Sequence, residues 1–192
     1  AVKDDAIREV AEALNLDNQL IVHTSGSVGL DVLEGISAKT GVFYPLQTFS
    51  QNIAIDFRTI PIAIEGSSAE VTATIRAMAD RLSERVIELD SVKRRTLHIA
   101  AVFSCNFTNH LYALSQQILN TEDLSFDLLR PLIAEASAKI QMNDPVAVQT
   151  GPAVRGDNNT LARHLEILKS NTKLAELYQM LSESIVNINK HS

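Results

Sequence analysis

The stretch "IPIAIEGSSAEVTATIRAMA", residues 60–79, decides the fold class of this chain. Its first six residues form an apolar run of the length of a buried strand, and Gly66-Ser67-Ser68 ends that run with a turn. Ser67 or Ser68 is a good N-cap, and Glu70 follows in the first turn of the helix that it would start. That helix carries apolar residues at helical spacing: Val71, Ile75, Met78, Ala79 and Leu82. The segment therefore predicts a strand followed directly by a helix.

The same alternation extends outward along the first half of the chain. Three further short apolar runs are expected strands: Leu20–Val22, Gly41–Leu46 and Val86–Leu89. A helix is predicted over residues 6–14, with Asp4 or Asp5 as its N-cap, and a short helix over residues 30–37. Strands that alternate with helices indicate an α/β layer with a mostly parallel sheet.

The second half of the chain offers hardly any strand candidate. One long apolar helix is predicted over residues 93–119, and a second over residues 125–141, with Pro131 as a kink or restart in its early turns. A loop rich in Gly, Pro and Asn follows at 143–159, before two final helices at 160–169 and 172–189. The sequence therefore predicts an α/β domain over residues 1–90 and an all-helical domain over residues 91–192.

Composition narrows the class of partners. The 192 residues are 45% apolar and 21% charged, and the formal net charge is −6, which gives no electrostatic footprint for nucleic acid or for an anionic membrane surface. The single cysteine, Cys105, excludes a disulfide framework and favours a reducing cytoplasm. No apolar run approaches the roughly 18–20 residues of a membrane span.

Polar residues gather where two of the expected strands end. In open parallel sheets, ligands bind outside the carboxyl ends of the strands. Two interpretations stay open: these residues form turns and helix caps, or they line one crevice. They are His23, Thr24, Ser25, Gly26 and Ser27 after the first strand, and Tyr44, Gln47 and Thr48 after the second.

A polar stripe interrupts the long apolar helix. At about 100° per residue with His98 at zero, Cys105 lies near −20°, Asn109 near +20°, Asn106 near +80° and His110 near +120°. Buried polar groups need partners, so this stripe indicates either a structural network or dimer interface, or a surface that faces a substrate. No metal site is expected, because the two histidines lie about three turns apart without a Cys pair or a His-Glu motif.

A third group of polar residues lies in "QTGPAVRGD", residues 149–157. Two glycines and a proline predict a shaped loop that presents Arg155 and Asp157. The arginine is able to clamp a carboxylate or phosphate with two hydrogen bonds, or the two charges pair with each other and brace the loop. Both interpretations stay open.

Taken together, these segments resemble a known family along essentially the whole chain. It is the family of bacterial Rossmann-like proteins with a C-terminal domain of unknown function (series 2520), commonly labelled predicted NADP-dependent or deazaflavin-coenzyme-dependent oxidoreductases. The resemblance rests on "AVKDDAI", "LIVHTSGSVGLDVL", "GVFYPLQTFS", "IPIAIEGSS", "LHIAAVFSCNFTNHL" and "QTGPAVRGDNNTL".

The resemblance implies a fold and an extent. It implies a Rossmann-like dinucleotide-binding domain followed by a helical domain like that of 6-phosphogluconate and hydroxyacid dehydrogenases, which typically forms the dimer contact. The chain contains no G-x-G-x-x-G motif, and in the family the Gly-rich phosphate loop would lie upstream of Ala1. We therefore expect a remnant of the Rossmann sheet with incomplete dinucleotide binding.

A more distant resemblance to prephenate dehydrogenases suggests roles. Those enzymes have a "GSV" turn after one strand, matched here by Gly26-Ser27-Val28, and an "HPM" turn after the next, where this chain has Tyr44-Pro45-Leu46. Tyr44 thus stands in place of the catalytic histidine, and either its phenol or the imidazole of His23 would act on the substrate. Hydroxyacid dehydrogenases place a Lys and an Asn on their first long helix, and here His98 would replace the lysine.

The expected function is that of an NADP- or NAD-dependent oxidoreductase, or one using a deazaflavin coenzyme, that acts on a small carbonyl or hydroxy substrate between the two domains, as a homodimer. A non-catalytic ligand-binding or sensor protein and a helical dimerisation module are the alternatives. The candidate catalytic residues are His23, Ser25, Tyr44, His98, Asn106 and Asn109. The candidate substrate-binding residues are Ser27, Gln47, Thr48, Arg155 and Asp157, and the candidate cofactor-binding residues are Thr24 and Gly26.

Overall fold

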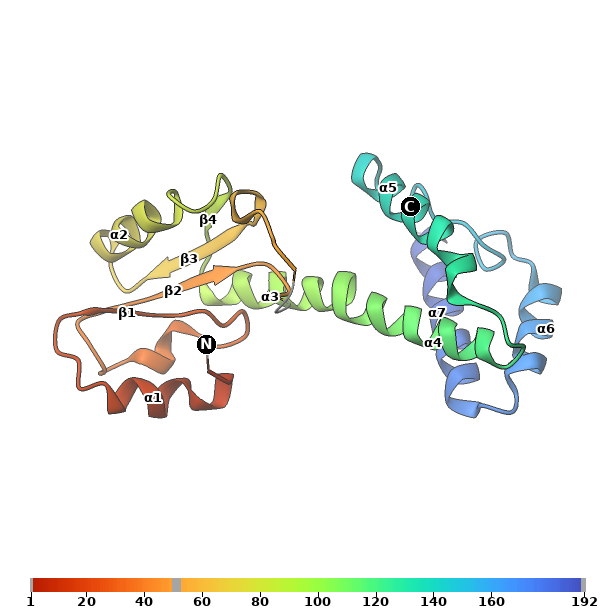
Figure 1. Ribbon diagram of the computed structural model, residues 1–192, viewed down its shortest axis with the longest axis horizontal. Coiled ribbons are helices and arrows are strands. Elements are labelled where there is room, and N and C mark those ends of the chain that lie inside the picture. Colours follow the sequence, from red (N-terminus) through yellow and green to blue (C-terminus); the bar gives the residue numbers. More distant parts are fainter. Residues whose placement is uncertain (1, 50–52, 191–192) are drawn as a thin grey trace. The chain divides into compact units, whose positions relative to one another are not determined.

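The computed structural model describes residues 2–49 and 53–190. The chain divides into two compact units, Ala1–Leu114 and Ser115–Ser192. The first unit holds the sheet and the second holds helices, as the sequence pattern predicts (Figure 1). The border between the two units, after Leu114, falls within the helix Thr108–Asn120. The domain border expected between residues 90 and 91 stays a prediction.

The first unit is built on a four-stranded sheet in the order β1-β2-β3-β4. Strand β1 pairs with β2 in parallel, β2 with β3 antiparallel, and β3 with β4 in parallel. The bounds are β1 Leu20–His23, β2 Lys39–Pro45, β3 Ile62–Gly66 and β4 Val86–Glu88. All four expected strands are therefore confirmed, with ends shifted by one or two residues.

Two of the three strand pairings are parallel, as expected of a mostly parallel sheet, and the central pair is antiparallel. A parallel connection needs a crossover of a dozen or more residues, usually through a helix. Between β2 and β3 the described residues contain only the 3-10 turn η3 (Phe57–Thr59), so the chain returns beside β2 in the opposite direction.

Helices cover both faces of the sheet, with α1 (Ile7–Ala13) and α2 (Ala69–Ala79) on opposite sides (Figure 1). Alternate strand residues Val22, Phe43 and Ile64 pack towards α2, where Ile75 is buried at 1% exposure. The opposite face packs against α1 and against α3 (Ser91–Ala101). The main core therefore lies between the sheet and α2.

The helix starts follow the sequence in one case and depart from it in another. Ser68 caps α2 as predicted, because its side chain accepts a hydrogen bond from the backbone N–H of Val71. Neither Asp4 nor Asp5 caps α1, which is preceded by the 3-10 turn η1 (Asp4–Ala6). The expected helix over 30–37 is the shorter 3-10 turn η2 (Leu30–Leu33).

The long helix predicted over residues 93–119 extends in the structure from Ser91 to Asn120, and it is not a uniform α-helix. It begins with α3, passes through a π-helical segment, η4 (Val102–Phe107), and continues as α4 (Thr108–Asn120). The hydroxyl of Thr108 donates to the carbonyl of Phe103, five residues earlier, which is the spacing of a π turn. An apolar pattern read at one constant angle per residue cannot reveal this change.

The second unit contains three α-helices among its described residues after α4, and one prediction at Pro131 is confirmed. A 3-10 turn, η5 (Phe126–Leu129), precedes α5, and Pro131 lies in the first turn of α5, where its missing N–H costs nothing. The helix bounds are α5 Arg130–Met142, α6 Asn158–Leu168 and α7 Thr172–Lys190. None of the helices described is both long and apolar enough to cross a membrane.

Candidate functional site

The strongest chemical feature of the first unit is a tyrosine–histidine pair. Tyr44 comes near the end of β2, and His98 comes from α3. The Tyr44 hydroxyl and the His98 Nδ1 lie 3.1 Å apart, and the two rings meet edge to face with their centroids 6.0 Å apart. Burial raises the pKa of Tyr44, so the phenol keeps its proton at neutral pH. The pair is therefore able to hold or pass a proton.

The loop after β1 lies directly against this pair. A Cβ at Gly26 would come within 2.6 Å of the His98 Nδ1 and 2.7 Å of the Tyr44 Cζ. No side chain fits there without moving the two rings. Glycine at position 26 thus lets the backbone of the strand-end loop pack against the Tyr44 and His98 rings, while a crevice that the residues after β1 and β2 line together stays a prediction.

A pocket of about 350 Å³ opens beside the pair, between the end of β2 and the π-helical segment. Its wall includes Gln47 and Thr48 from the chain after β2, and Asn106 from η4. The backbone N–H of Thr48 donates to the Gln47 Oε1 over 2.8 Å. Five predicted site residues, from two parts of the chain that are far apart in the sequence, therefore line one pocket: Tyr44, Gln47, Thr48, His98 and Asn106.

Of the two candidate asparagines, Asn106 lines the pocket and Asn109 lies outside its lining, although both side chains are exposed. Asn106 belongs to the π-helical segment, whose turns hold more residues than α turns, so angles counted along a uniform α-helix do not apply there.

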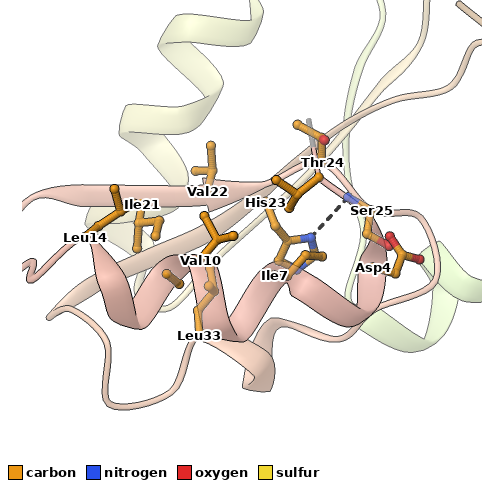
Figure 2. Close-up of a pocket in the computed structure, with 12 residues that line it drawn as sticks. Asp4, Ile7, Val10, Leu14, Ile21, Val22, His23, Thr24, Ser25 and Leu33 are labelled. Atoms are coloured by element: carbon orange, nitrogen blue, oxygen red, sulfur yellow. Dashed lines mark hydrogen bonds between the residues drawn. The ribbon is translucent and has the colours of Figure 1, made fainter.

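His23 and Ser25 are held in a different environment, at a second pocket of about 420 Å³ beside α1 (Figure 2). The His23 Nδ1 accepts the backbone N–H of Ser25 over 3.2 Å, and the Ser25 hydroxyl accepts the N–H groups of Ser27 and Val28. The Ser27 hydroxyl donates to the carboxylate of Asp4. These contacts shape the turn after β1.

The imidazole of His23 is 6% exposed, and its Nε2 is buried without a hydrogen-bond partner among the described residues. Burial and the nearby guanidinium of Arg94 lower the pKa of His23, while the backbone carbonyl of Gly29 acts in the opposite direction. The ring is therefore neutral near pH 7. A catalytic role for His23 and Ser25 stays a prediction, as does a cofactor contact by the exposed Thr24.

Arg155 and Asp157 belong to the second unit. Asp157 caps α6: its carboxylate accepts the backbone N–H of Thr160 over 3.0 Å and its hydroxyl over 2.7 Å. These bonds lower the pKa of Asp157. Arg155 is exposed, and the ion pairs of the described residues do not include one between Arg155 and Asp157. The charge of Arg155 contributes to the lowered pKa of Asp157 without a direct ion pair, so both the bracing and the substrate role stay predictions.

Sequence reasoning missed the residue that fixes α3 to the sheet. Arg94 is fully buried; its guanidinium pairs with Glu65 of β3 and donates to the backbone carbonyl of Val28. The hydroxyl of Ser91 donates to the Glu65 Oε2 over 2.8 Å. In the sequence Arg94 is the middle residue of the short basic run "KRR". The one signal for its burial is that it precedes His98 by four residues and so shares a helix face with it.

Comparison with known proteins identifies the scaffold. A crystal structure of a Bacteroides fragilis protein named "putative NADP oxidoreductase" matches with a TM-score of 0.89 and 43% sequence identity, over 97% of this chain and 73% of that chain. A Thermotoga maritima protein of known structure matches with a TM-score of 0.81 over 99% of this chain and 76% of that chain, and its 22% identity supports the fold alone. No curated protein matches this chain.

The family assignment rests on a match to a protein-family sequence profile as well as on these structures. The model of the "Domain of unknown function (DUF2520)" matches residues 60–185, from the third strand to the last helix. The resemblance stated from the sequence motifs is thereby confirmed. This chain belongs to the DUF2520 family.

Proposed function

We propose that this protein is an oxidoreductase that transfers a hydride between NADP(H) and a small carbonyl or hydroxy compound, with Tyr44 and His98 handling the proton. The observation that carries the proposal is the 3.1 Å contact between the Tyr44 hydroxyl and the His98 Nδ1 at a pocket beside Gly26. The name of the Bacteroides protein, with 43% identity, supports NADP as the coenzyme. NAD(H) and a deazaflavin coenzyme are the alternative hydride carriers.

The described residues offer one exposed group for the nicotinamide end of such a coenzyme. Thr24 is exposed on the loop after β1, and Gly26 of the same loop packs against the Tyr44 and His98 rings. A bound nicotinamide would supply the hydride to a carbonyl carbon, or remove it from an alcohol carbon.

The chain's own part is the proton. In reduction, the Tyr44 O–H donates to the carbonyl oxygen as that oxygen becomes a hydroxyl, and a protonated His98 returns a proton to the phenolate through Nδ1. The raised pKa of Tyr44 keeps the phenol neutral and ready to donate. The amides of Gln47 and Asn106 line the same pocket and would hold the substrate.

The test measures NADPH and NADH consumption with a panel of aldehydes and ketones, with a reduced deazaflavin in parallel. Tyr44→Phe is expected to lower kcat roughly 10²- to 10⁴-fold, the usual contribution of a general acid. Tyr178→Phe is the matched control, because Tyr178 forms a similar pair with His164, 2.8 Å from hydroxyl to Nδ1, in the second unit. Coenzyme binding without turnover would refute the proposal and favour the sensor alternative.

We also propose that the protein forms a homodimer through its helical unit. Among the described residues of that unit only Ala153 is buried, and large apolar side chains are exposed on each of its later helices. Exposed apolar surface of this kind marks an interaction site. Examples are Leu132 on α5, Ile167 on α6 and Met180 on α7. Sedimentation equilibrium is expected to give a dimer, and a monomer at high protein concentration would refute the dimer.

For the location of the protein we propose the cytoplasm, because a chain with a single cysteine forms no disulfide framework.

A further inference from the structure

We infer that the pocket at Tyr44 and His98 takes an uncharged hydroxy-carbonyl compound, without a carboxylate or phosphate beside the reacting carbon. The inference rests on the proposed function, because it names the substrate class of the same site. It is carried by the kind of side chains in the pocket wall rather than by the reactive pair itself.

The wall of this pocket is largely apolar with several neutral polar side chains, and it contains no acidic residue, lysine or arginine among the described residues that line it. Its polar side chains are Tyr44, Gln47, Thr48, His98, Ser104 and Asn106, with the thiol of Cys105. An anion that leaves water for such a wall loses its hydration and meets no lysine or arginine in exchange. The wall therefore disfavours a charged substrate and accepts a neutral one.

The arginine best placed to help is already engaged. Arg94 precedes His98 by four residues, which puts both on one face of α3. Its guanidinium pairs with Glu65 and donates to the Val28 carbonyl, and its side chain is fully buried. It has no exposed surface with which to meet a substrate carboxylate.

The two carboxamides fit hydroxyl and carbonyl groups. Gln47 and Asn106 come from opposite walls, the chain after β2 and the π-helical segment, and each amide offers donors and an acceptor. The Gln47 Oε1 already accepts the Thr48 N–H, so its amide nitrogen is the group left to donate. A volume of about 350 Å³ suits a small ligand of a few carbons.

The test compares two ketones that differ in one group, dihydroxyacetone and hydroxypyruvate, which carries a carboxylate where the first has a hydroxymethyl group. Each is titrated into the full chain while NMR follows the Val102 methyl groups, which line the pocket, and the His98 imidazole. Dihydroxyacetone is expected to shift these signals with saturation, and hydroxypyruvate to bind at least roughly 10-fold more weakly. Equal or tighter binding of hydroxypyruvate would overturn the inference, as would the lack of any shift with dihydroxyacetone.

Substitutions in the pocket wall test whether dihydroxyacetone binds at the pocket beside Tyr44 and His98. Asn106→Leu is expected to weaken dihydroxyacetone binding several-fold, and Gln47→Met does the same from the other wall. Gln116→Leu removes an exposed carboxamide from α4 outside the pocket and is expected to leave binding unchanged. Neither titration needs a coenzyme or hydride transfer. Preferential binding of dihydroxyacetone without turnover would therefore refute only the proposed function, whereas turnover that prefers hydroxypyruvate would refute only the substrate class.

Discussion

Replacing Arg94 with methionine tests how α3 is fixed to the sheet. The side chain of Arg94 is 0% exposed and that of its partner Glu65 is 17% exposed. Removing one partner of a buried ion pair costs about 3–5 kcal/mol, because the other charge is left uncompensated. Arg94→Met is expected near the lower end, since Glu65 keeps two hydrogen bonds from Ser91, at 3.1 Å from its N–H and 2.8 Å from its hydroxyl.

The reverse substitution is expected to cost more. Glu65→Gln leaves a fully buried guanidinium that cannot lose its proton, so its cost lies near the upper end of about 3–5 kcal/mol. The double variant Glu65→Leu with Arg94→Met removes both charges and is expected to be less destabilised than Glu65→Gln alone. This order of stabilities follows from the unequal burial of the two partners.

The assay is urea unfolding followed by far-UV circular dichroism, with hydrogen exchange of the β3 amides to identify the unit that unfolds. With an m-value of about 1–3 kcal/mol/M, a loss of about 3 kcal/mol lowers the midpoint by roughly 1–3 M. Arg76→Met is the matched control, because the Arg76–Glu88 pair is 37% and 55% exposed and such pairs contribute about 0–1 kcal/mol. If Arg94→Met costs no more than Arg76→Met, α3 is not fixed by this pair.

Three further predictions concern single side chains. Because the folded pKa of His23 is lowered, its contribution to stability is complete above about pH 6.5 and is lost as pH falls from that value to the folded pKa, by up to about 1.4 kcal/mol per pH unit; His23→Gln should flatten this part of the profile in urea titrations. Burial raises the pKa of Tyr44, so phenolate absorbance should show a component that rises above pH 10 in the wild type and in Tyr178→Phe but is missing in Tyr44→Phe. Ser68→Ala removes the cap of α2 and should cost about 1 kcal/mol of unfolding free energy, whereas no loss would mean that the cap is dispensable.

Local signals were sufficient for most of the fold. The apolar run that ends in Gly66, the Ser68 cap and the helical spacing of Val71 and Ile75 each depend on residues a few positions apart, and the structure confirms each. The restart at Pro131 is of the same kind. Such features depend on local backbone geometry and short-range hydrogen bonds, and these can be inferred from the types of neighbouring residues.

The features that the sequence did not predict depend on longer distances or on one altered turn. The antiparallel pairing of Tyr44 with Ala63 depends on how the chain returns after β2. The Glu65–Arg94 pair joins residues 29 positions apart, and the sequence around Arg94 does not identify Glu65 as its partner. The π turn changes the rotation of Asn106 without changing which residues are apolar. The site residues were thus found by type, while their grouping required the structure.

The contact between Tyr44 and His98 lies where two neighbouring strands differ in length. The register of β1 and β2 ends with His23 opposite Val42, while β2 continues through Tyr44 to Pro45 with β3 as its partner. After His23 the chain turns, and Gly26 packs against the Tyr44 and His98 rings. A side chain at position 26 would push these two rings apart. Ending β1 early, with glycine three residues later, is therefore what leaves the phenol and the imidazole in contact at the edge of a pocket.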